Sequence, residues 1–216
     1  MSYTTYIFDL DGTLLDTLQD LTNAVNYAMR QMNCPERTLD EVRRFIGDGM
    51  RKLIERSAPK NTDAEQIEKT LEFFKAYYSG HLADFTKPYD GIENVIDTLK
   101  SQGKKLAVVS NKADEAAKAV VKEYFGDSFD IVVGQNDGIP AKPSPESVNC
   151  VIKTLNADRS ECIYIGDSDV DVLTAHNAGL KCIGVTWGNR GRQELVDSGA
   201  EYIAEHPFEI IKAAQI

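Results

Sequence analysis

The chain has 216 residues, 42% of them hydrophobic and 27% charged, which is enough for one globular core with a small second module. Its net charge of −10 argues against a nucleic-acid backbone or an anionic membrane as a partner, although a local site could still bind a small anion. The four cysteines are scattered without a C-x-x-C pair, and no apolar run reaches the roughly 20 residues of a membrane span, so we expect free thiols and a cytoplasmic protein.

The first predicted element is a β-strand over the apolar run Thr5–Phe8, which begins so close to Met1 that we expect no signal peptide. Asp9 and Asp11 follow it, and the alternation of side chains along a strand places both carboxylates on the same side. Two like charges this close repel each other and require a metal ion or a shared proton. Gly12 then permits a sharp turn, so we expect the chemistry here.

Residues 16–82 predict an all-helical module. Apolar residues recur at three- and four-residue spacing through residues 18–32 and again through residues 67–82. Thr38, followed three residues later by Glu41, predicts a capping box at the start of a helix. Two loop-forming stretches divide the module into about four helices, namely Cys34-Pro35 and Gly47-Asp48-Gly49.

The remainder of the chain alternates apolar strands with helical patterns. Near-continuous apolar strands separated by helices predict a parallel sheet covered on both faces, that is, a doubly wound α/β fold. We therefore expect a core domain of residues 1–15 and 83–216, with the helical module of residues 16–82 inserted into it. The further strands are expected at residues 106–110, 131–133, 162–165, 182–185 and 202–203.

Polar residues follow several of these strands, at the edge where ligands bind in such sheets. Ser110-Asn111-Lys112 comes after the second strand, and Gly166-Asp-Ser-Asp-Val-Asp171 comes after the fourth and opens a helix. Lys142 precedes another helix, which Ser144 is expected to cap and in which Pro145 suits the first position. We expect all these groups to converge at one edge of the sheet.

These residue types suit phosphate chemistry. A carboxylate can attack phosphorus and form an acyl-phosphate, while a second carboxylic acid protonates the leaving alkoxide and later deprotonates water. Magnesium, a hard cation, can hold carboxylates and phosphate oxygens together. A hydroxyl group or a helix N-terminus can bind phosphate oxygens, and a lysine supplies a point charge for the developing negative charge.

The charge of the group predicts a cation. Four aspartates contribute −4 if all are ionised, namely Asp9, Asp11, Asp167 and Asp171. Lys142 returns one positive charge, so a phosphate dianion would approach a site with a net charge of −3. Magnesium brings that charge to −1 and a proton on Asp11 brings it to zero, so we expect catalysis to require the metal.

Taken together, the motifs resemble the four motifs of the haloacid-dehalogenase superfamily, in the family's order and across the whole predicted core. The matching segments are Asp9-Leu-Asp-Gly-Thr13, Ser110-Asn111, Lys142-Pro-Ser-Pro-Glu146 and Gly166-Asp-Ser-x-x-Asp171. The resemblance implies a Rossmann-like core in which Asp9 is the nucleophile and Asp11 the general acid and base. An aspartate at the Asp11 position favours phosphate chemistry over dehalogenation.

The resemblance also implies the remaining roles. Asp9, Asp167 and the main-chain carbonyl of Asp11 would bind magnesium, and Asp171 would support the metal shell or the lysine. The residues that would hold the phosphate are Thr13, Ser110, Asn111 and Lys142, of which Lys142 also acts catalytically.

The inserted module resembles the small cap domain of the phosphoglycolate-phosphatase-like branch. Phe45-Ile-Gly-Asp-Gly49 is similar to the cap loop of that branch, and Pro88-Tyr-Asp-Gly91 resembles its Pro-x-x-Gly. The resemblance implies a phosphatase for a small phosphorylated metabolite, with 2-phosphoglycolate as the first choice. Phosphatases for sugar phosphates, nucleotides and pyrophosphate share this layout. We expect a monomer or a homodimer, with no nucleic acid or membrane as partner.

Other interpretations of the motifs remain open to test. Asp9 and Asp11 alone would fit a solvated turn, and a phosphomutase would use the same scaffold, although residues 14–33 lack the histidine of the sugar-mutase caps. A non-catalytic phospho-ligand sensor would carry a broken motif. A calcium loop starting at Asp167 would need glycine and glutamate where Val172 and Ala178 stand.

Lesser candidates receive structural interpretations. The three histidines are too far apart in sequence for a local zinc motif, and Trp187 is expected to pack. Arg51 and Lys52 are expected on a solvated helix face, with the hypothesis that one of them meets a substrate carboxylate.

Overall fold

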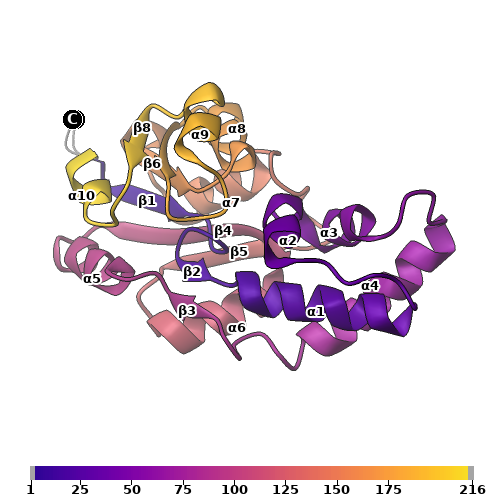
Figure 1. Cartoon of the computed structure of the whole chain (residues 1–216). Coiled ribbons are helices and arrows are strands. Elements are labelled where there is room, and N and C mark those ends of the chain that lie inside the picture. The colour runs from indigo at the N-terminus through magenta and orange to yellow at the C-terminus, as the bar shows by residue number, and fades with distance from the viewer. Residues whose placement is uncertain (1–2, 214–216) are drawn as a thin grey trace. The chain divides into compact units, whose positions relative to one another are not determined.

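The computed structural model describes residues 3–213 and divides the chain into two compact units (Figure 1). We call Met1–Asp16 with Pro88–Ile216 the core unit, and Thr17–Lys87 the helical unit. Among the described residues, no helix combines the length and apolar character that a membrane crossing requires.

A six-stranded parallel sheet forms the centre of the core unit, in the order β5-β4-β1-β6-β7-β8. The predicted strands are confirmed, and the central strand β1 is completely buried between β4 and β6. The strands are β1 (Thr5–Phe8), β4 (Lys105–Ala113), β5 (Ile131–Gln135), β6 (Cys162–Gly166), β7 (Lys181–Val185) and β8 (Tyr202–Ala204).

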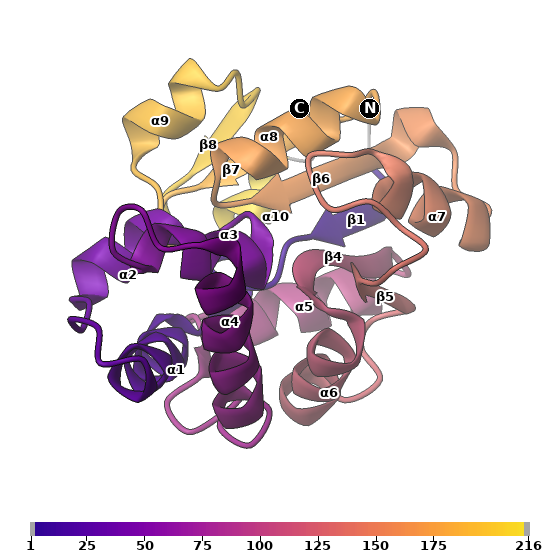
Figure 2. The ribbon, with the colours of Figure 1, turned by 90° about the vertical axis from the view of Figure 1, so that its right-hand side faces the viewer.

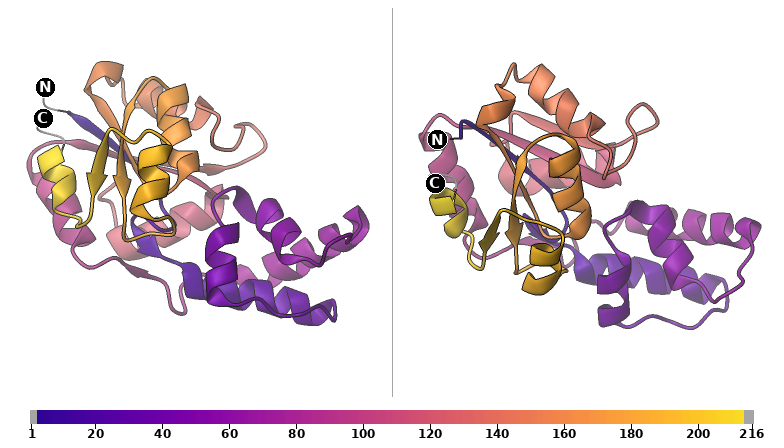
Figure 3. Two further views of the ribbon diagram at one scale, coloured as in Figure 1. Left: turned by 45° about the horizontal axis from the view of Figure 1, so that its top comes forward. Right: turned by 90° about the horizontal axis from the view of Figure 1, so that it is seen from above.

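Helices cover both faces of this sheet, which confirms the doubly wound fold. Alternate residues such as Ile7, Val109 and Tyr164 pack in one cluster with residues of α7 and α8. Figure 2 shows α5 and α6 on the opposite side of the sheet, and α10 lies beside α5 (Figure 3). The helices of this unit are α5 (Ile92–Ser101), α6 (Asp114–Phe125), α7 (Glu146–Thr154), the 3₁₀ turn η1 (Arg159–Glu161), α8 (Asp169–Asn177), α9 (Arg192–Asp197) and α10 (Glu209–Ala213).

Two boundaries in the core unit differ from the prediction. Strand β4 continues through Ser110-Asn111-Lys112 to Ala113, with a register shift between Val109 and Ala113 that re-aims these side chains. Helix α7 begins at Glu146, so Pro145 rather than Ser144 occupies the cap position and no side chain caps this end. The backbone N–H of Ser144 instead donates to the Ala141 carbonyl at 3.0 Å, which closes a turn before the helix.

The helical unit contains the four predicted helices and its own core. The capping box of Thr38 and Glu41 is confirmed, but the last helix ends at Tyr78 rather than continuing to Leu82, which packs beside the core from the following turn. The helices are α1 (Leu18–Gln31), α2 (Leu39–Phe45), α3 (Gly49–Ser57) and α4 (Ala64–Tyr78). A separate two-stranded sheet pairs β2 (Leu15–Asp16) with β3 (Lys87–Pro88).

A buried carboxylate joins the two ends of the helical unit. Asp20, in the first turn of α1, is 1% exposed and accepts hydrogen bonds from the backbone N–H groups of Phe85 and Thr86 at 2.8–3.1 Å. The hydroxyl of Thr86 donates to the same carboxylate at 2.8 Å. Three donors from one segment therefore share the carboxylate of Asp20 as an acceptor.

We predict that Asp20→Ala lowers the free energy of unfolding by about 2–4 kcal/mol, because it removes the carboxylate that accepts hydrogen bonds from Phe85 and from the buried Thr86. Urea denaturation of the whole chain measures this change. Gln19→Ala, next to it but exposed, is the matched control and should change stability by less than about 0.5 kcal/mol. Equal stabilities of the two variants would contradict the role of the Asp20 carboxylate.

Candidate active site

The predicted functional residues meet at the carboxyl edge of the sheet, within the core unit. Asp9 directly follows β1, and Asp167 directly follows the neighbouring strand β6. Lys142 comes from the segment between β5 and α7, and Asp171 from the first turn of α8. Parallel strands end at the same edge, so residues far apart in the sequence become neighbours there.

The ammonium group of Lys142 lies at the centre of this group. Its Nζ donates to Asp9 Oδ1 at 2.6 Å and to Asp171 Oδ1 at 2.7 Å, and the lysine side chain is 4% exposed. The Tyr164 hydroxyl, 3.2 Å from Nζ, lies within reach of the third ammonium proton. Burial by itself lowers the pKa of Lys142, but the charges of Asp171 and Asp9 outweigh it and raise that pKa well above its usual value.

Asp171 is a positioning residue whose oxygens are fully used. Oδ1 accepts from Lys142 and lies 3.2 Å from the Tyr164 hydroxyl, while Oδ2 accepts from the backbone N–H of Ser168 at 3.1 Å and from its hydroxyl at 2.6 Å. A carboxylate offers about four lone-pair sites, and these four donors occupy them. Asp171 therefore holds the lysine and caps α8, and it would need to give up a hydrogen bond to ligate a metal.

Asp167 retains an oxygen that can bind a cation. Its Oδ2 accepts from the backbone N–H and from the side-chain amide of Asn189, at 2.7 and 3.0 Å. Its Oδ1 has a weaker partner, the Thr13 hydroxyl at 3.4 Å. Gly12 lies against both side chains, since a Cβ on this residue would overlap Asn189 and Asp167.

Three buried carboxylates lie close enough together to suit a divalent cation, with Asp9 and Asp167 as the candidate ligands among them. One oxygen from each of Asp9, Asp167 and Asp171 lies within 4.8 Å of the others. Burial and the charge of Asp171 raise the pKa of Asp9 well above its usual value, and the same two causes raise the pKa of Asp167 to about 7. Without a cation, the ionised forms of Asp9 and Asp167 are therefore destabilised relative to their protonated forms.

Lys112 is a site residue that the charge count from the sequence omitted. Its Nζ lies 3.1 and 3.5 Å from the two carboxylate oxygens of Asp11, and its side chain is 4% exposed. With this second ammonium group the ionised site has a net charge of −2 rather than −3. A divalent cation then brings it to zero with every aspartate ionised.

The three residues predicted to bind phosphate besides Lys142 are buried near this group. The side chain of Asn111 is paired with the backbone of Lys142, accepting from its N–H at 2.8 Å and donating to its carbonyl at 3.2 Å. Ser110 Oγ accepts from the backbone N–H of Lys112 at 3.1 Å, and Thr13 directs its hydroxyl toward Asp167. Their contact with phosphate stays a prediction.

Sequence reasoning assigned no role to four contributors, namely Lys112, Tyr164, Ser168 and Asn189, although Lys112 and Ser168 stand in segments that it expected at this edge. The sequence pattern could have indicated roles for two of them. Ser168 and Asp171 have the spacing of a capping box, and Lys112 directly follows Ser110-Asn111. Tyr164 lies two residues before Gly166 in β6, and the alternation of side chains along a strand could have placed both on the same face of the sheet. Asn189 had no local signal, since only the fold brings its loop to Asp167.

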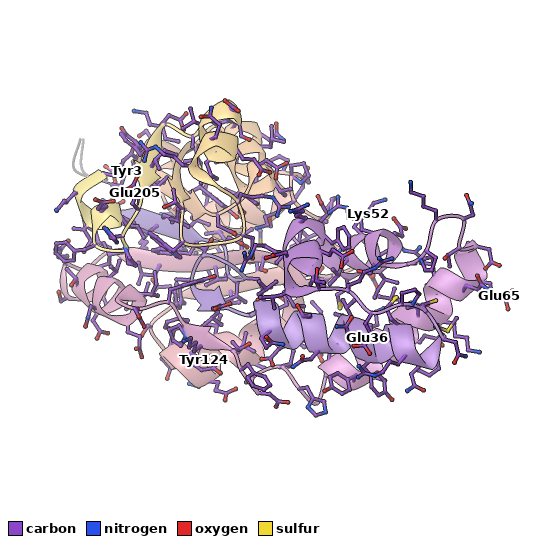
Figure 4. All side chains as sticks on the ribbon, viewed as in Figure 1. Tyr3, Glu36, Lys52, Glu65, Tyr124 and Glu205 are labelled. Atoms are coloured by element: carbon purple, nitrogen blue, oxygen red, sulfur yellow. The ribbon has the colours of Figure 1, made fainter. Side chains whose placement is uncertain are left out.

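The lesser candidates have partners of their own within their units. The indole N–H of Trp187 donates to the carbonyl of Thr13 at 3.1 Å, so this residue ties its loop to the first motif. On α3, Arg51 pairs with Glu55 at 3.5 Å and also with Glu68, and Lys52 (Figure 4) pairs with Glu55 at 2.8 Å. Among the histidines, His81 pairs with Asp84 and His176 with Glu201, while His206 is exposed.

Comparisons with known proteins agree with this geometry. The family model of haloacid dehalogenase-like hydrolases matches residues 6–185. The phosphoglycolate phosphatase of Caulobacter vibrioides is 34% identical over 97% of this chain and 90% of its own length, and that of Aquifex aeolicus is 34% identical over 84% of each. A Lactobacillus delbrueckii subsp. bulgaricus crystal structure, described as a candidate phosphoglycolate phosphatase, superposes with a TM-score of 0.95 at 35% identity over 99% of both chains.

We predict that the metal-free protein loses stability as the pH rises from about 4 to 7. The folded-state pKa of Asp167, about 7, exceeds the value of about 3.9 in an unfolded chain, so the folded state retains a proton that the unfolded state releases. The proton on Asp167 stabilises the folded state fully below about pH 4, and this contribution to the free energy of unfolding is lost as the pH rises through about 7. Thermal unfolding in EDTA measures it, and Asp167→Asn should make the loss of stability in that range shallower, while Asp9, whose pKa is also raised, keeps part of it. A parent profile no steeper than that of the variant would contradict the prediction.

Proposed function

The chain belongs to the haloacid dehalogenase-like hydrolases, and from this membership we propose that it is a magnesium-dependent phosphatase that forms an aspartyl-phosphate on Asp9. The observation that carries the proposal is the buried Lys142 ammonium, 2.6 Å from Asp9, beside a cluster of carboxylates at the edge of the sheet. The names of the relatives make 2-phosphoglycolate the first substrate to test.

Three oxygen donors would hold the magnesium ion: the carboxylates of Asp9 and Asp167 and the main-chain carbonyl of Asp11. Hard oxygen donors suit magnesium, and the surplus of buried negative charge supports a dication here. When bound, the cation neutralises the carboxylates and polarises the phosphoryl oxygens.

In the first half-reaction, a carboxylate oxygen of Asp9 attacks phosphorus while the bond from phosphorus to the ester oxygen breaks. Asp11 donates its proton to the departing alkoxide, which leaves as the alcohol. The side chain of Asp11 is 21% exposed, so it can exchange protons with solvent. Lys142 orients the nucleophile and stabilises negative charge on the transferred phosphoryl group.

In the second half-reaction, Asp11 is a carboxylate and takes a proton from water. The water oxygen attacks phosphorus, and the bond from phosphorus to the Asp9 oxygen breaks. Inorganic phosphate leaves, and the carboxylate of Asp9 and the protonated form of Asp11 are both restored. The hydroxyl of Ser110 and the ammonium of Lys142, with Thr13 and Asn111, are the proposed phosphate contacts.

We further propose that the helical unit acts as a cap over the substrate, on the predicted boundaries of residues 1–15 and 83–216 for the core and 16–82 for the cap. A cap that closes would exclude water from the acyl-phosphate until hydrolysis. Four free cysteines support the proposal of a cytoplasmic enzyme that acts on a small phosphorylated metabolite.

We predict that Asp9→Asn lowers kcat by more than about 10³-fold for 2-phosphoglycolate and other phosphomonoesters, because the amide is a poor nucleophile. Release of inorganic phosphate with magnesium present measures it. Asp169→Asn is the matched control, because this aspartate opens α8 in the same motif but its side chain is 43% exposed. Parental turnover by Asp9→Asn would remove the nucleophile from the proposal.

We also predict that EDTA abolishes turnover and that excess magnesium restores it. With every aspartate ionised the site has a net charge of −2 without a cation, which repels a phosphate dianion and leaves the buried carboxylates uncompensated. Phosphate release before EDTA, in EDTA and after magnesium is returned measures the effect. Unchanged turnover in EDTA would show that the cation is not required.

A further inference from the structure

The loop after β7 contacts the site but belongs to none of the four motifs. In it, Asn189 donates two hydrogen bonds to the same carboxylate oxygen, Oδ2 of Asp167, from its backbone N–H at 2.7 Å and from its side-chain amide at 3.0 Å. Asp167 is 2% exposed, so these bonds are shielded from water. One residue thus fixes the orientation of a buried carboxylate that ends the neighbouring strand β6.

We infer that Asn189 is a positioning residue for cation binding, which turns Asp167 so that a single oxygen, Oδ1, faces the divalent cation. The inference rests on the proposed function, because it takes Asp167 as a magnesium ligand. The two donors of Asn189 occupy both lone pairs of Oδ2. Oδ1 keeps a lone pair, because the hydrogen bond it accepts from the described part of the chain comes from the Thr13 hydroxyl at 3.4 Å.

The packing of this loop fixes the position of Asn189. A Cβ on Gly188 would overlap the Gly12 carbonyl and the side chain of Asp167, and a Cβ on Gly12 would overlap the Asn189 amide. Gly12 also has a φ of +95°, which side chains rarely adopt. The indole N–H of Trp187, in the same loop, donates a hydrogen bond to the carbonyl of Thr13 and so holds the loop at the first motif.

An asparagine suits the positioning of Asp167 because its amide donates a hydrogen bond without adding a charge to the site. A lysine in its place would neutralise Asp167 and weaken its attraction for a cation, and an aspartate would present a further carboxylate to Oδ2. A carboxylate that offers one oxygen also fits magnesium, which requires near-octahedral geometry at short distances. The backbone N–H and the side-chain amide of Asn189 together orient the Asp167 carboxylate through protein hydrogen bonds rather than through water.

The test is magnesium binding by the substrate-free protein, measured by isothermal titration calorimetry after EDTA treatment and dialysis. Asn189→Ala keeps the backbone donor and loses the amide, so its Kd should rise about tenfold, at the low end of the 10–100-fold that such supporting residues contribute. Asn189→Leu, which is close in size to asparagine but has no side-chain donor, should weaken magnesium binding by a similar factor. Gln193→Ala, an exposed amide bonded to Asp197, is the matched control and should bind as the parent does.

Turnover separates positioning from a general loss of structure. The kcat of Asn189→Ala should approach the parental value at saturating magnesium, which a general loss of structure would not allow. Parental Kd values in both Asn189 variants would overturn the inference, and so would a lowered kcat that magnesium does not restore. A parent that binds magnesium but releases no phosphate would overturn the proposed function and leave the Asn189 comparison to decide the inference. A parent that binds no magnesium would overturn both.

Discussion

The buried contact of the Lys142 ammonium with Asp9 and Asp171 is the interaction on which the rest of the site depends. It joins the end of β1, the segment before α7 and the first turn of α8, three parts of the chain that only the sheet brings together. Removing one partner of such a buried pair costs about 3–5 kcal/mol, since the other charge is left uncompensated. The same contact aims the Asp9 carboxylate, so stability and chemistry depend on a single group.

One ammonium group is not enough for the carboxylates around it. One carboxylate oxygen from each of Asp9, Asp167 and Asp171 lies within 4.8 Å of the other two, and burial raises the pKa of Asp9 and Asp167. The second ammonium group, on Lys112, faces Asp11 and so does not relieve that cluster. The surplus negative charge is the physical reason for a divalent cation, and Asp171, whose oxygens are fully hydrogen-bonded, leaves that cation to its neighbours.

Much of the fold followed from local patterns. Apolar runs such as Thr5–Phe8 predicted the strands, and the residues after them predicted the edge where Asp9 and Lys142 meet. The pattern could not predict that β4 continues past Val109 with a register shift, because a bulge is set by pairing with β5. The pairing of Lys112 with Asp11 and the contact of Asn189 with Asp167 were not predicted for a similar reason, since both residues act across the fold on residues distant in sequence.

The most direct test of the central claim is to trap the phosphoryl group on Asp9. The variant Asp11→Asn, mixed with magnesium and p-nitrophenyl phosphate, whose leaving group departs without protonation, should transfer the phosphoryl group but hydrolyse the adduct slowly. Rapid acid quench and peptide mass spectrometry should then find one phosphoryl group per protein on the peptide that contains Asp9, together with a stoichiometric burst of nitrophenolate. A burst with the phosphoryl group on another residue, or turnover without any adduct, would contradict the account.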